Sequence, residues 1–420
     1  MWSFLMSIAV ICTGTELLKG GCCNTNMRLL GEKLTRHALP PVMELSIGDH
    51  AGELCYALSC ALKIADTIII SGGLGPTTDD ITLHTVNRFF GTELVEIPEL
   101  KEKVEKLWAL RHNSRCPKFQ YKQAQIIRGG RYFDNPAGVA SGIGFSVDYA
   151  GKMRHIFLLP GPPAEFETLL DNGMLKAITD LAQEKLYTTG FFICGMGEVM
   201  VARTIEPLLE QLPVEIAYTA MPGGTKLFLS GKDETLLNAA IRQCREAIGK
   251  NALDINCFDL PSALLAKLAD NKLTFGCAES CTGGLAANAI VSLPGASAVF
   301  QGSVVSYANQ VKNRVLGVSE DILNSVGAVS PQCAEAMARG ACQALACDCA
   351  ISTTGIAGPD GGTPEKPVGL VYVAACVKGV CTVRELRLRG NRQMIRERAV
   401  AGALQLLWEL LDTPELDTVC

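Results

Sequence analysis

Residues 66–80 read DTIIISGGLGPTTDD, and this stretch indicates the fold of the first part of the chain. The run of three isoleucines is short, apolar and β-branched, which is typical of a strand buried on both faces. A glycine-rich turn follows it, and two aspartates then stand where helices begin. The residues before it, ELCYALSCALKIA (53–65), have a helical pattern. Strands that alternate with helices in this way are typical of a parallel α/β sheet.

The same alternation extends to both sides of this stretch and returns later in the chain. SIAVICTG (7–14) and RHIFLLPGPP (154–163) are expected to be further strands that end in turns. A middle part with short strands and two helices breaks the pattern, and strands are expected again near 273–277, 299–306, 349–354 and 368–377. We therefore predict two parallel-sheet α/β domains joined by a small α+β module, with the boundaries 1–170, 171–256 and 257–420.

Composition excludes several classes of protein. The 420 residues are 48% hydrophobic and 19% charged, which describes a folded chain long enough for two or three domains. The net charge of −5 comes without a basic stripe, so a nucleic-acid partner is not expected. The 18 cysteines include no CxxC pair and have no standard zinc spacing, which favours reduced thiols in the cytosol.

The amino-terminal stretch MWSFLMSIAVICTG lacks the basic region and the small-residue cleavage site of a signal peptide. A core strand at SIAVICTG explains its apolar character better. No uncharged apolar run reaches the roughly 18 residues that a membrane span needs. We therefore expect a cytoplasmic protein without a membrane partner.

Three glycine-rich turns in the first part each follow a predicted strand: TGTELLKGG (13–21), SGGLGPTTDD (71–80) and LPGPP (159–163). Ligands of α/β proteins bind at the carboxyl ends of parallel strands, where glycines let the backbone approach a phosphate. Tight turns with Asp79 and Asp80 as helix caps are the alternative, but three such turns together favour a site. The candidate residues are Thr15, Glu16, Ser71, Gly72, Gly73, Gly75, Asp79, Pro160 and Gly161. The carboxylates Glu16, Asp49 and Asp80 would suit a hard divalent cation.

Residues 277–287, CAESCTGGLAA, raise a question about the third part of the chain. Ser280, Cys281 and Thr282 follow a predicted strand and precede a glycine pair, so the stretch is either a capped helix start or a turn that presents a nucleophile. Two more polar stretches favour the second interpretation: GSVVSYANQVKNRV (302–315), and the loop STTGIAGPDGGTPEKPVG (352–369).

A serine nucleophile needs a base to take its proton. None of the five histidines lies in the third part, which excludes a local Ser-His-Asp triad. Lys312 can be the base if its pKa is lowered, and Tyr307 could relay the proton or hold the lysine. Because a thiolate is intrinsically more nucleophilic, the residue types alone leave both Ser280 and Cys281 as candidates.

GTELLKG, NTN, SGGLGPTTDD, YKQA, NPAG and LPGPP occur in the order and spacing of the amino-terminal half of the CinA (competence/damage-inducible protein A) family, which the chain resembles over its full length. That half is similar to the molybdopterin-binding fold of the MoaB and MogA proteins. The resemblance implies a nucleotide ligand and ADP-ribose pyrophosphatase activity that needs a divalent metal ion (Mg²⁺, Mn²⁺ or Co²⁺). It makes Asp80 the main metal-side carboxylate, with Glu16 and Asp49 near it.

AESCTGG, GSVVSYANQVK, TTGIAGPDGGTPEKPVG and RGNR resemble the carboxyl-terminal domain of the same family, which is similar to the nicotinamide-nucleotide amidase PncC. The resemblance implies hydrolysis of nicotinamide mononucleotide to nicotinate mononucleotide and ammonia, without a cofactor. We also expect a homodimer. Ser280 would be the nucleophile, with Tyr307 and Lys312 as its activating pair. The implied substrate-binding residues are Glu279, Thr282, Gly283, Thr354, Gly355 and Arg392. The alternative is a pterin- or nucleotide-binding regulatory protein whose amino-terminal part lacks catalysis.

Overall fold

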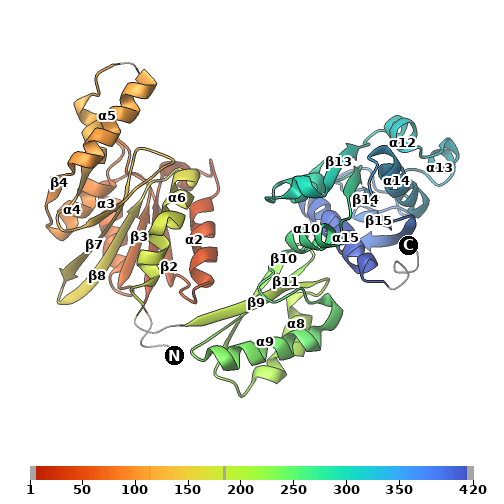
Figure 1. The fold of residues 1–420 in the computed structure, drawn as a ribbon, viewed down its shortest axis with the longest axis horizontal. Coiled ribbons are helices and arrows are strands. Elements are labelled where there is room, and N and C mark those ends of the chain that lie inside the picture. Colours follow the sequence, from red (N-terminus) through yellow and green to blue (C-terminus); the bar gives the residue numbers. More distant parts are fainter. Residues whose placement is uncertain (1–5, 113, 183–185, 414–420) are drawn as a thin grey trace. The chain divides into compact units, whose positions relative to one another are not determined.

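The computed structural model describes residues 6–112, 114–182 and 186–413, and the chain divides into two compact units, Met1–Thr188 and Thr189–Cys420 (Figure 1). The boundaries predicted from the sequence were 170 and 256. The first unit extends past 170 because Met174 and Ile178 are buried in its core. The α+β module belongs to the second unit because its Phe192 and Leu253 share one hydrophobic core with the carboxyl-terminal helices.

The first unit is built on a six-stranded sheet with the order β2-β1-β3-β8-β7-β6. The first four strands in this order are parallel, β7 pairs antiparallel with β8, and β6 pairs antiparallel with β7. The α/β class is thus confirmed, with an antiparallel edge that the sequence analysis did not predict. The strands, with the short pair β4–β5, are β1 (Ile8–Thr13), β2 (Met43–Ile47), β3 (Thr67–Ser71), β4 (Leu94–Glu96), β5 (Gln125–Ile127), β6 (Arg131–Phe133), β7 (Gly142–Tyr149) and β8 (Lys152–Leu159).

Helices cover both faces of this sheet (Figure 1). Ile68 and Ile70 of β3 pack with α3 on one face, whereas Ile69 packs with α2 and α6 on the other. The isoleucine run is therefore buried on both faces, as its composition predicts. The helices are α1 (Thr15–Leu18), α2 (Thr25–Thr35), α3 (Ala51–Ala61), α4 (Thr82–Phe90), α5 (Pro98–His112), η1 (Lys118–Ala124), α6 (Pro163–Leu169), η2 (Leu170–Met174) and α7 (Leu175–Thr179).

The second unit begins with the α+β module, a three-stranded sheet of order β10-β11-β9 with two long helices. The β10–β11 hairpin turns at Pro222 and Gly223, the turn predicted from the sequence. Its elements are β9 (Tyr187–Cys194), α8 (Glu198–Leu209), β10 (Glu215–Met221), β11 (Gly224–Gly231), α9 (Glu234–Ile248) and η3 (Gly249–Asn251).

The rest of the second unit is a five-stranded sheet of order β13-β12-β14-β15-β16. β13, β12 and β14 are parallel, and β15 and β16 form an antiparallel edge. The strands are β12 (Phe275–Glu279), β13 (Phe300–Val305), β14 (Cys349–Gly355), β15 (Leu370–Val377) and β16 (Val380–Arg387). The helices are α10 (Leu260–Asp270), α11 (Leu285–Val291), η4 (Ala296–Ala298), α12 (Asn309–Leu316), α13 (Glu320–Ser325), α14 (Pro331–Ala344) and α15 (Arg392–Leu411).

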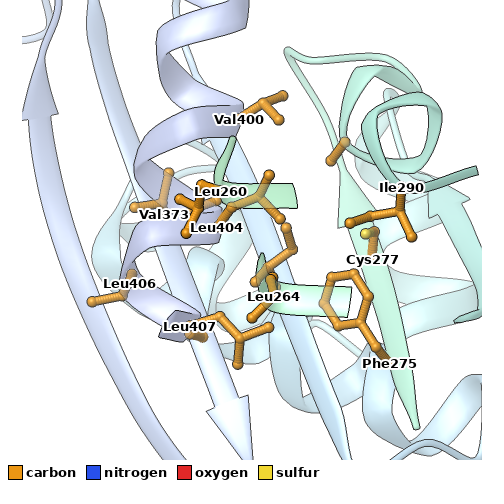
Figure 2. Packing of buried hydrophobic residues seen from close by; sticks show 14 of the residues in the cluster. Leu260, Leu264, Phe275, Cys277, Ile290, Val373, Val400, Leu404, Leu406 and Leu407 are labelled. Atoms are coloured by element: carbon orange, nitrogen blue, oxygen red, sulfur yellow. The ribbon is translucent and has the colours of Figure 1, made fainter. Parts of the chain in front are cut away.

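Two sets of helices enclose this sheet. Figure 2 shows Leu404 and Leu407 of α15 packed with Leu264 of α10 and Phe275 of β12. On the other face, α12 and α14 pack against Ala278 of β12 and its neighbours. The strand that leads to Ser280 is therefore held by apolar contacts on both sides, which gives the residues after it a rigid base.

The structure contains a disulfide, and its helices can be compared with what a membrane span requires. Cys376 and Cys381 are opposite each other in the β15–β16 register and form a disulfide, whereas the composition favoured reduced thiols throughout. The other described cysteines are free. None of the described helices is both long and apolar enough to cross a membrane.

Candidate active site

Ser280 and Lys312 meet at the carboxyl end of β12. Ser280 follows the last residue of that strand, and Lys312 extends from α12 with its Nζ 3.0 Å from the serine Oγ. Lys312 is 1% exposed and Ser280 is 9% exposed. The same Nζ lies 2.7 Å from the carbonyl oxygen of Ser306 and 3.2 Å from that of Tyr307. The two residues that the sequence placed 32 positions apart are thus in direct contact.

The surroundings of Lys312 favour its neutral form. Burial lowers its pKa from the usual value, and no carboxylate among the described residues contacts the amine to oppose that shift. A neutral amine has two N–H groups and one lone pair. The two carbonyl oxygens can accept both N–H groups, which leaves the lone pair for the hydroxyl proton of Ser280. The geometry therefore suits a general base.

Cys281, the rival nucleophile, lies in a different environment. It is buried in the hydrophobic core formed with α15, and burial raises the pKa of its thiol to about 11. A thiol with that pKa is almost entirely protonated at neutral pH and is a weak nucleophile. The structure thus favours Ser280 in the choice that the residue types left open.

The role of Glu279 in the structure differs from the substrate contact that the family resemblance implies. It is fully buried, and its carboxylate accepts hydrogen bonds from the hydroxyls of Thr282 and Ser303. It also accepts from the backbone N–H groups of Gly284, Ala286 and Ala287, at 2.8, 3.0 and 3.0 Å. Five donors on one carboxylate fix the turn that follows Ser280, so Glu279 positions the nucleophile and does not face the substrate.

Arg396 completes the support of this turn and was missed in the sequence. Its Nη2 and Nε donate to the carbonyl oxygens of Thr282 and Cys281, at 2.6 and 3.2 Å. Glu279 thus binds the N–H groups of the turn, and Arg396 binds its C=O groups. The available signal was the position of Arg396, one helical turn after the predicted Arg392 on α15.

The structure also changes the expected roles of other predicted residues. The side chain of Tyr307 faces solvent, 66% exposed, and only its carbonyl oxygen contacts Lys312. Thr282 is fully buried between Glu279 and Thr353. The buried Thr354 donates its hydroxyl to the Ala328 carbonyl at 2.6 Å.

The three remaining predicted residues belong to backbone features of the site. Arg392 donates to the carbonyl of Gly358 at 2.6 Å and so anchors the long loop. Gly355 ends β14, where a side chain would collide with β15. Gly283 lies in the turn after Ser280, and the N–H groups of Gly283 and Thr282 have no acceptor among the described residues. Such free donors near a nucleophile are suited to an oxyanion.

A cavity of about 470 Å³ in the first unit gathers the three glycine-rich turns predicted from the sequence. Gly72 has a φ of +109° and approaches Thr13 so closely that a Cβ would lie 2.3 Å from the Thr13 carbonyl oxygen, so only glycine fits there. Thr15 and Ser71 support the wall without lining the cavity. The predicted residues that line it are Glu16, Asp49, Gly72, Gly73, Gly75, Asp79, Asp80, Pro160 and Gly161.

The predicted metal ligands share this cavity but do not form a complete site. No three His, Cys, Asp or Glu side chains of the described residues are arranged to hold a metal ion. Asp49 accepts two hydrogen bonds from Thr15, and Asp80 accepts two from Thr77. Carboxylate oxygens suit Mg²⁺ by their chemistry, but in each of these two aspartates Oδ2 already accepts both hydrogen bonds. As placed, they do not fit a metal held by the protein alone.

A second part of the cavity wall comes from residues that the sequence analysis did not select. Trp108, Arg111 and His112 of α5 line the cavity, together with the amide side chains of Gln120 and Gln123. The rings of Trp108 and His112 stack at 4.0 Å. The only signal in the sequence that could have indicated this part of the wall was a tryptophan near the end of a polar helix.

Comparisons with known proteins agree with this architecture. The family model described as "CinA C-terminal domain" matches residues 258–411, and that described as "Probable molybdopterin binding domain" matches residues 9–180. A competence-damage inducible protein of Moorella thermoacetica is 38% identical over 417 residues, which are 97% of this chain and 99% of that protein. A CinA-like protein of Dictyoglomus turgidum is 34% identical over 409 residues, 96% of this chain and 98% of that protein.

Among solved structures, the competence/damage inducible protein CihA from Agrobacterium tumefaciens is 40% identical. The match covers 37% of this chain and 94% of that one, with a TM-score of 0.36. The class defined by fold and sites is a two-unit α/β protein with a glycine-turn cavity in one unit and a buried serine–lysine pair in the other. Because relatives match over nearly their whole length, the chain belongs to the CinA family.

Proposed function

We propose that the second unit hydrolyses the carboxamide of nicotinamide mononucleotide to nicotinate mononucleotide and ammonia, with Ser280 as nucleophile. The observation that carries the proposal is the 3.0 Å contact between Lys312 Nζ and Ser280 Oγ, in surroundings that lower the lysine pKa. That pair supports hydrolysis of an acyl compound. Membership of the CinA family and the motif resemblance to nicotinamide-nucleotide amidases support this particular amide.

In the first half-reaction, neutral Lys312 takes the Ser280 proton as Oγ bonds to the amide carbon. The carbonyl oxygen becomes an oxyanion, for which the free N–H groups of Thr282 and Gly283 are available. The Lys312 ammonium then gives its proton to the amide nitrogen. The C–N bond breaks, ammonia leaves, and a nicotinyl ester remains on Ser280.

In the second half-reaction, water attacks the ester carbon while Lys312 takes one of its protons. The C–Oγ bond breaks, and Lys312 returns the proton to Ser280. Each half-reaction begins and ends with a neutral lysine, and burial, which lowers the pKa of Lys312, favours that form.

The test is ammonia release from nicotinamide mononucleotide by the purified protein, measured with a coupled glutamate dehydrogenase assay. Two comparison substrates are nicotinamide riboside, which lacks the phosphate, and nicotinamide, which lacks the whole ribotide. We expect the wild-type protein to release ammonia from the mononucleotide and Ser280→Ala to abolish this release. No release from any of the three compounds would contradict the proposal.

A second function is proposed for the cavity of the first unit: binding of a nucleotide such as ADP-ribose, with hydrolysis of its pyrophosphate. The glycine-rich turns support phosphate binding, but five carboxylates (Glu16, Asp49, Asp79, Asp80 and Glu165) also line the cavity. Phosphate beside so many carboxylates requires a cation, so a divalent ion would enter with the ligand. The test is AMP release from ADP-ribose with and without Mg²⁺ or Mn²⁺. Binding of ADP-ribose without AMP release would favour the alternative, a nucleotide-binding regulatory protein whose first unit lacks catalysis.

A further inference from the structure

The cavity of the first unit has two chemically different parts. One part is formed by the glycine-rich turns and the carboxylates at the ends of β1, β2, β3 and β8. The other is formed by α5, which projects from the unit in Figure 1, and by η1. This second part offers an indole, a guanidinium and two carboxamides, from Trp108, Arg111, Gln120 and Gln123. The two parts together suit a ligand with phosphates, accompanied by a cation, at one end and a flat, hydrogen-bonding ring at the other.

Trp108 has the placement of a stacking platform. Its ring lines the cavity while His112 stacks on it at 4.0 Å, and its Nε1 donates to Ser114 Oγ at 3.2 Å. These contacts hold the indole in one orientation before any ligand arrives. Stacking of a base on an aromatic side chain is worth about 1–3 kcal/mol. The neighbouring carboxamides have the donors and acceptors that the edge of a base requires.

We propose that Trp108 binds the base of a purine nucleotide in this cavity, with the phosphates at the glycine-rich turns. The proposal rests on the nucleotide binding proposed above and adds which residue recognises the base. Purine rings offer a larger stacking face than pyrimidine rings, so AMP should bind more tightly than UMP, although by a modest factor because every base can stack on an indole. The role is one of binding and specificity, and it requires no catalytic step.

The experiment measures binding of ADP-ribose, AMP, UMP and ribose 5-phosphate to the full chain by calorimetry, with Mg²⁺ present. Trp108→Leu should weaken ADP-ribose and AMP by about tenfold or more, and ribose 5-phosphate by less than about twofold. Trp108→Phe, which keeps an aromatic ring, should recover most of the affinity. Leu110→Ala is the matched control, because Leu110 lies on the same helix but is 76% exposed and outside the cavity wall.

A second readout is the fluorescence of Trp108 in a Trp2→Phe, Trp408→Phe background, which leaves it as the single tryptophan of the chain. AMP should quench it and ribose 5-phosphate should not. Equal binding of ADP-ribose by wild type and Trp108→Leu would overturn the proposal, as would an equal loss of ribose 5-phosphate, which would make Trp108 a packing residue. If wild type binds ribose 5-phosphate as tightly as AMP, the phosphate-binding part of the proposal is supported and the base-binding role of Trp108 is refuted. If it binds none of the four, the proposed function of the cavity falls as well.

Discussion

Lys312 Nζ lies 3.0 Å from Ser280 Oγ, and no carboxylate of the described residues contacts that amine. A buried lysine normally keeps its charge through an acidic partner. Here its partners are a hydroxyl and two neutral carbonyls, so the charged form is poorly compensated. The arrangement costs stability and supplies a base, which is the pattern expected of an active site.

The first prediction concerns the nucleophile. Ser280→Ala should reduce amide hydrolysis by about 10³-fold or more, because the bond-forming atom is lost. Cys281→Ala should keep most of the activity, since a thiol pKa of about 11 leaves on the order of one molecule in ten thousand as thiolate at neutral pH. Initial rates of ammonia release measure both. An inactive cysteine variant beside an active serine variant would reverse the assignment.

The second prediction is a pH profile. The base is the neutral lysine, so kcat/KM should fall about tenfold per pH unit below the pKa of Lys312 along a single ionisation. Burial lowers that pKa below the ordinary 10.5, so the plateau should begin at a lower pH than for an exposed lysine. The measurement is kcat/KM for the amide substrate from pH 5 to pH 10.

Lys312→Arg tests the same assignment from the other side. A guanidinium cannot give up its proton at any of these pH values, so the variant should lose activity across the whole profile. Thermal unfolding of the variant checks that it remains folded. A folded and active arginine variant would show that the positive charge, and not proton transfer, is what the reaction uses.

Local patterns in the sequence predicted the parts of the fold and site that depend on neighbours along the chain. The isoleucines before Ser71 and the glycines after it identify a buried strand and its turn because strand burial and positive φ are local properties. Ser280 and Lys312 were both selected because each lies in a polar stretch that follows a predicted strand, and the family resemblance pairs them. The antiparallel edge strands were missed, since alternation with helices does not give strand direction.

Contacts between distant elements could not be predicted in this way. Arg396 binds carbonyl groups more than 110 positions away, and its only local signal is its position one helical turn after Arg392. Tyr307 was assigned a hydroxyl role because its type suits proton relay, yet the helix start directs its ring to solvent. Glu279 was placed with the substrate because the family resemblance implied it. Only the five donors around it show that its carboxylate is already satisfied.

The third prediction concerns Glu279. Glu279→Gln keeps the shape but replaces one acceptor oxygen by an NH₂ group that faces backbone and hydroxyl donors. Loss of such contacts at a buried carboxylate should lower the free energy of unfolding by about 2–4 kcal/mol. The measurement is chemical unfolding of the full chain. Glu246→Gln, at an exposed position of α9 in the same unit, is the control and should change stability by less than about 0.5 kcal/mol. Equal stability of the two variants would refute the role of Glu279.

The fourth prediction concerns Arg396. Its two nitrogens reach two adjacent carbonyl groups of the nucleophile turn, which a lysine cannot reproduce. Arg396→Lys should therefore lower kcat by about 10- to 100-fold with a smaller change in KM, because the turn is less well positioned. Arg398→Lys is matched in type and helix, and its contact is with Arg389 instead. Similar kcat losses in both variants would mean that helix charge, not the turn contact, matters.

The last prediction separates the two units. The hydrophobic core of the second unit includes Phe192 and Leu253 of the α+β module, so a fragment starting at Tyr187, the first residue of β9, should fold and unfold as one cooperative body. It should hydrolyse the amide in the presence of EDTA, because the proposed mechanism uses Ser280 and Lys312 in both half-reactions and no metal. A fragment of the first unit should bind ADP-ribose, and any hydrolysis should require a divalent cation to balance the cavity carboxylates. Asp80→Asn should weaken that hydrolysis more than it weakens folding. Chelation should thus abolish one activity and spare the other, and an equal loss of both on adding EDTA would contradict two independent sites.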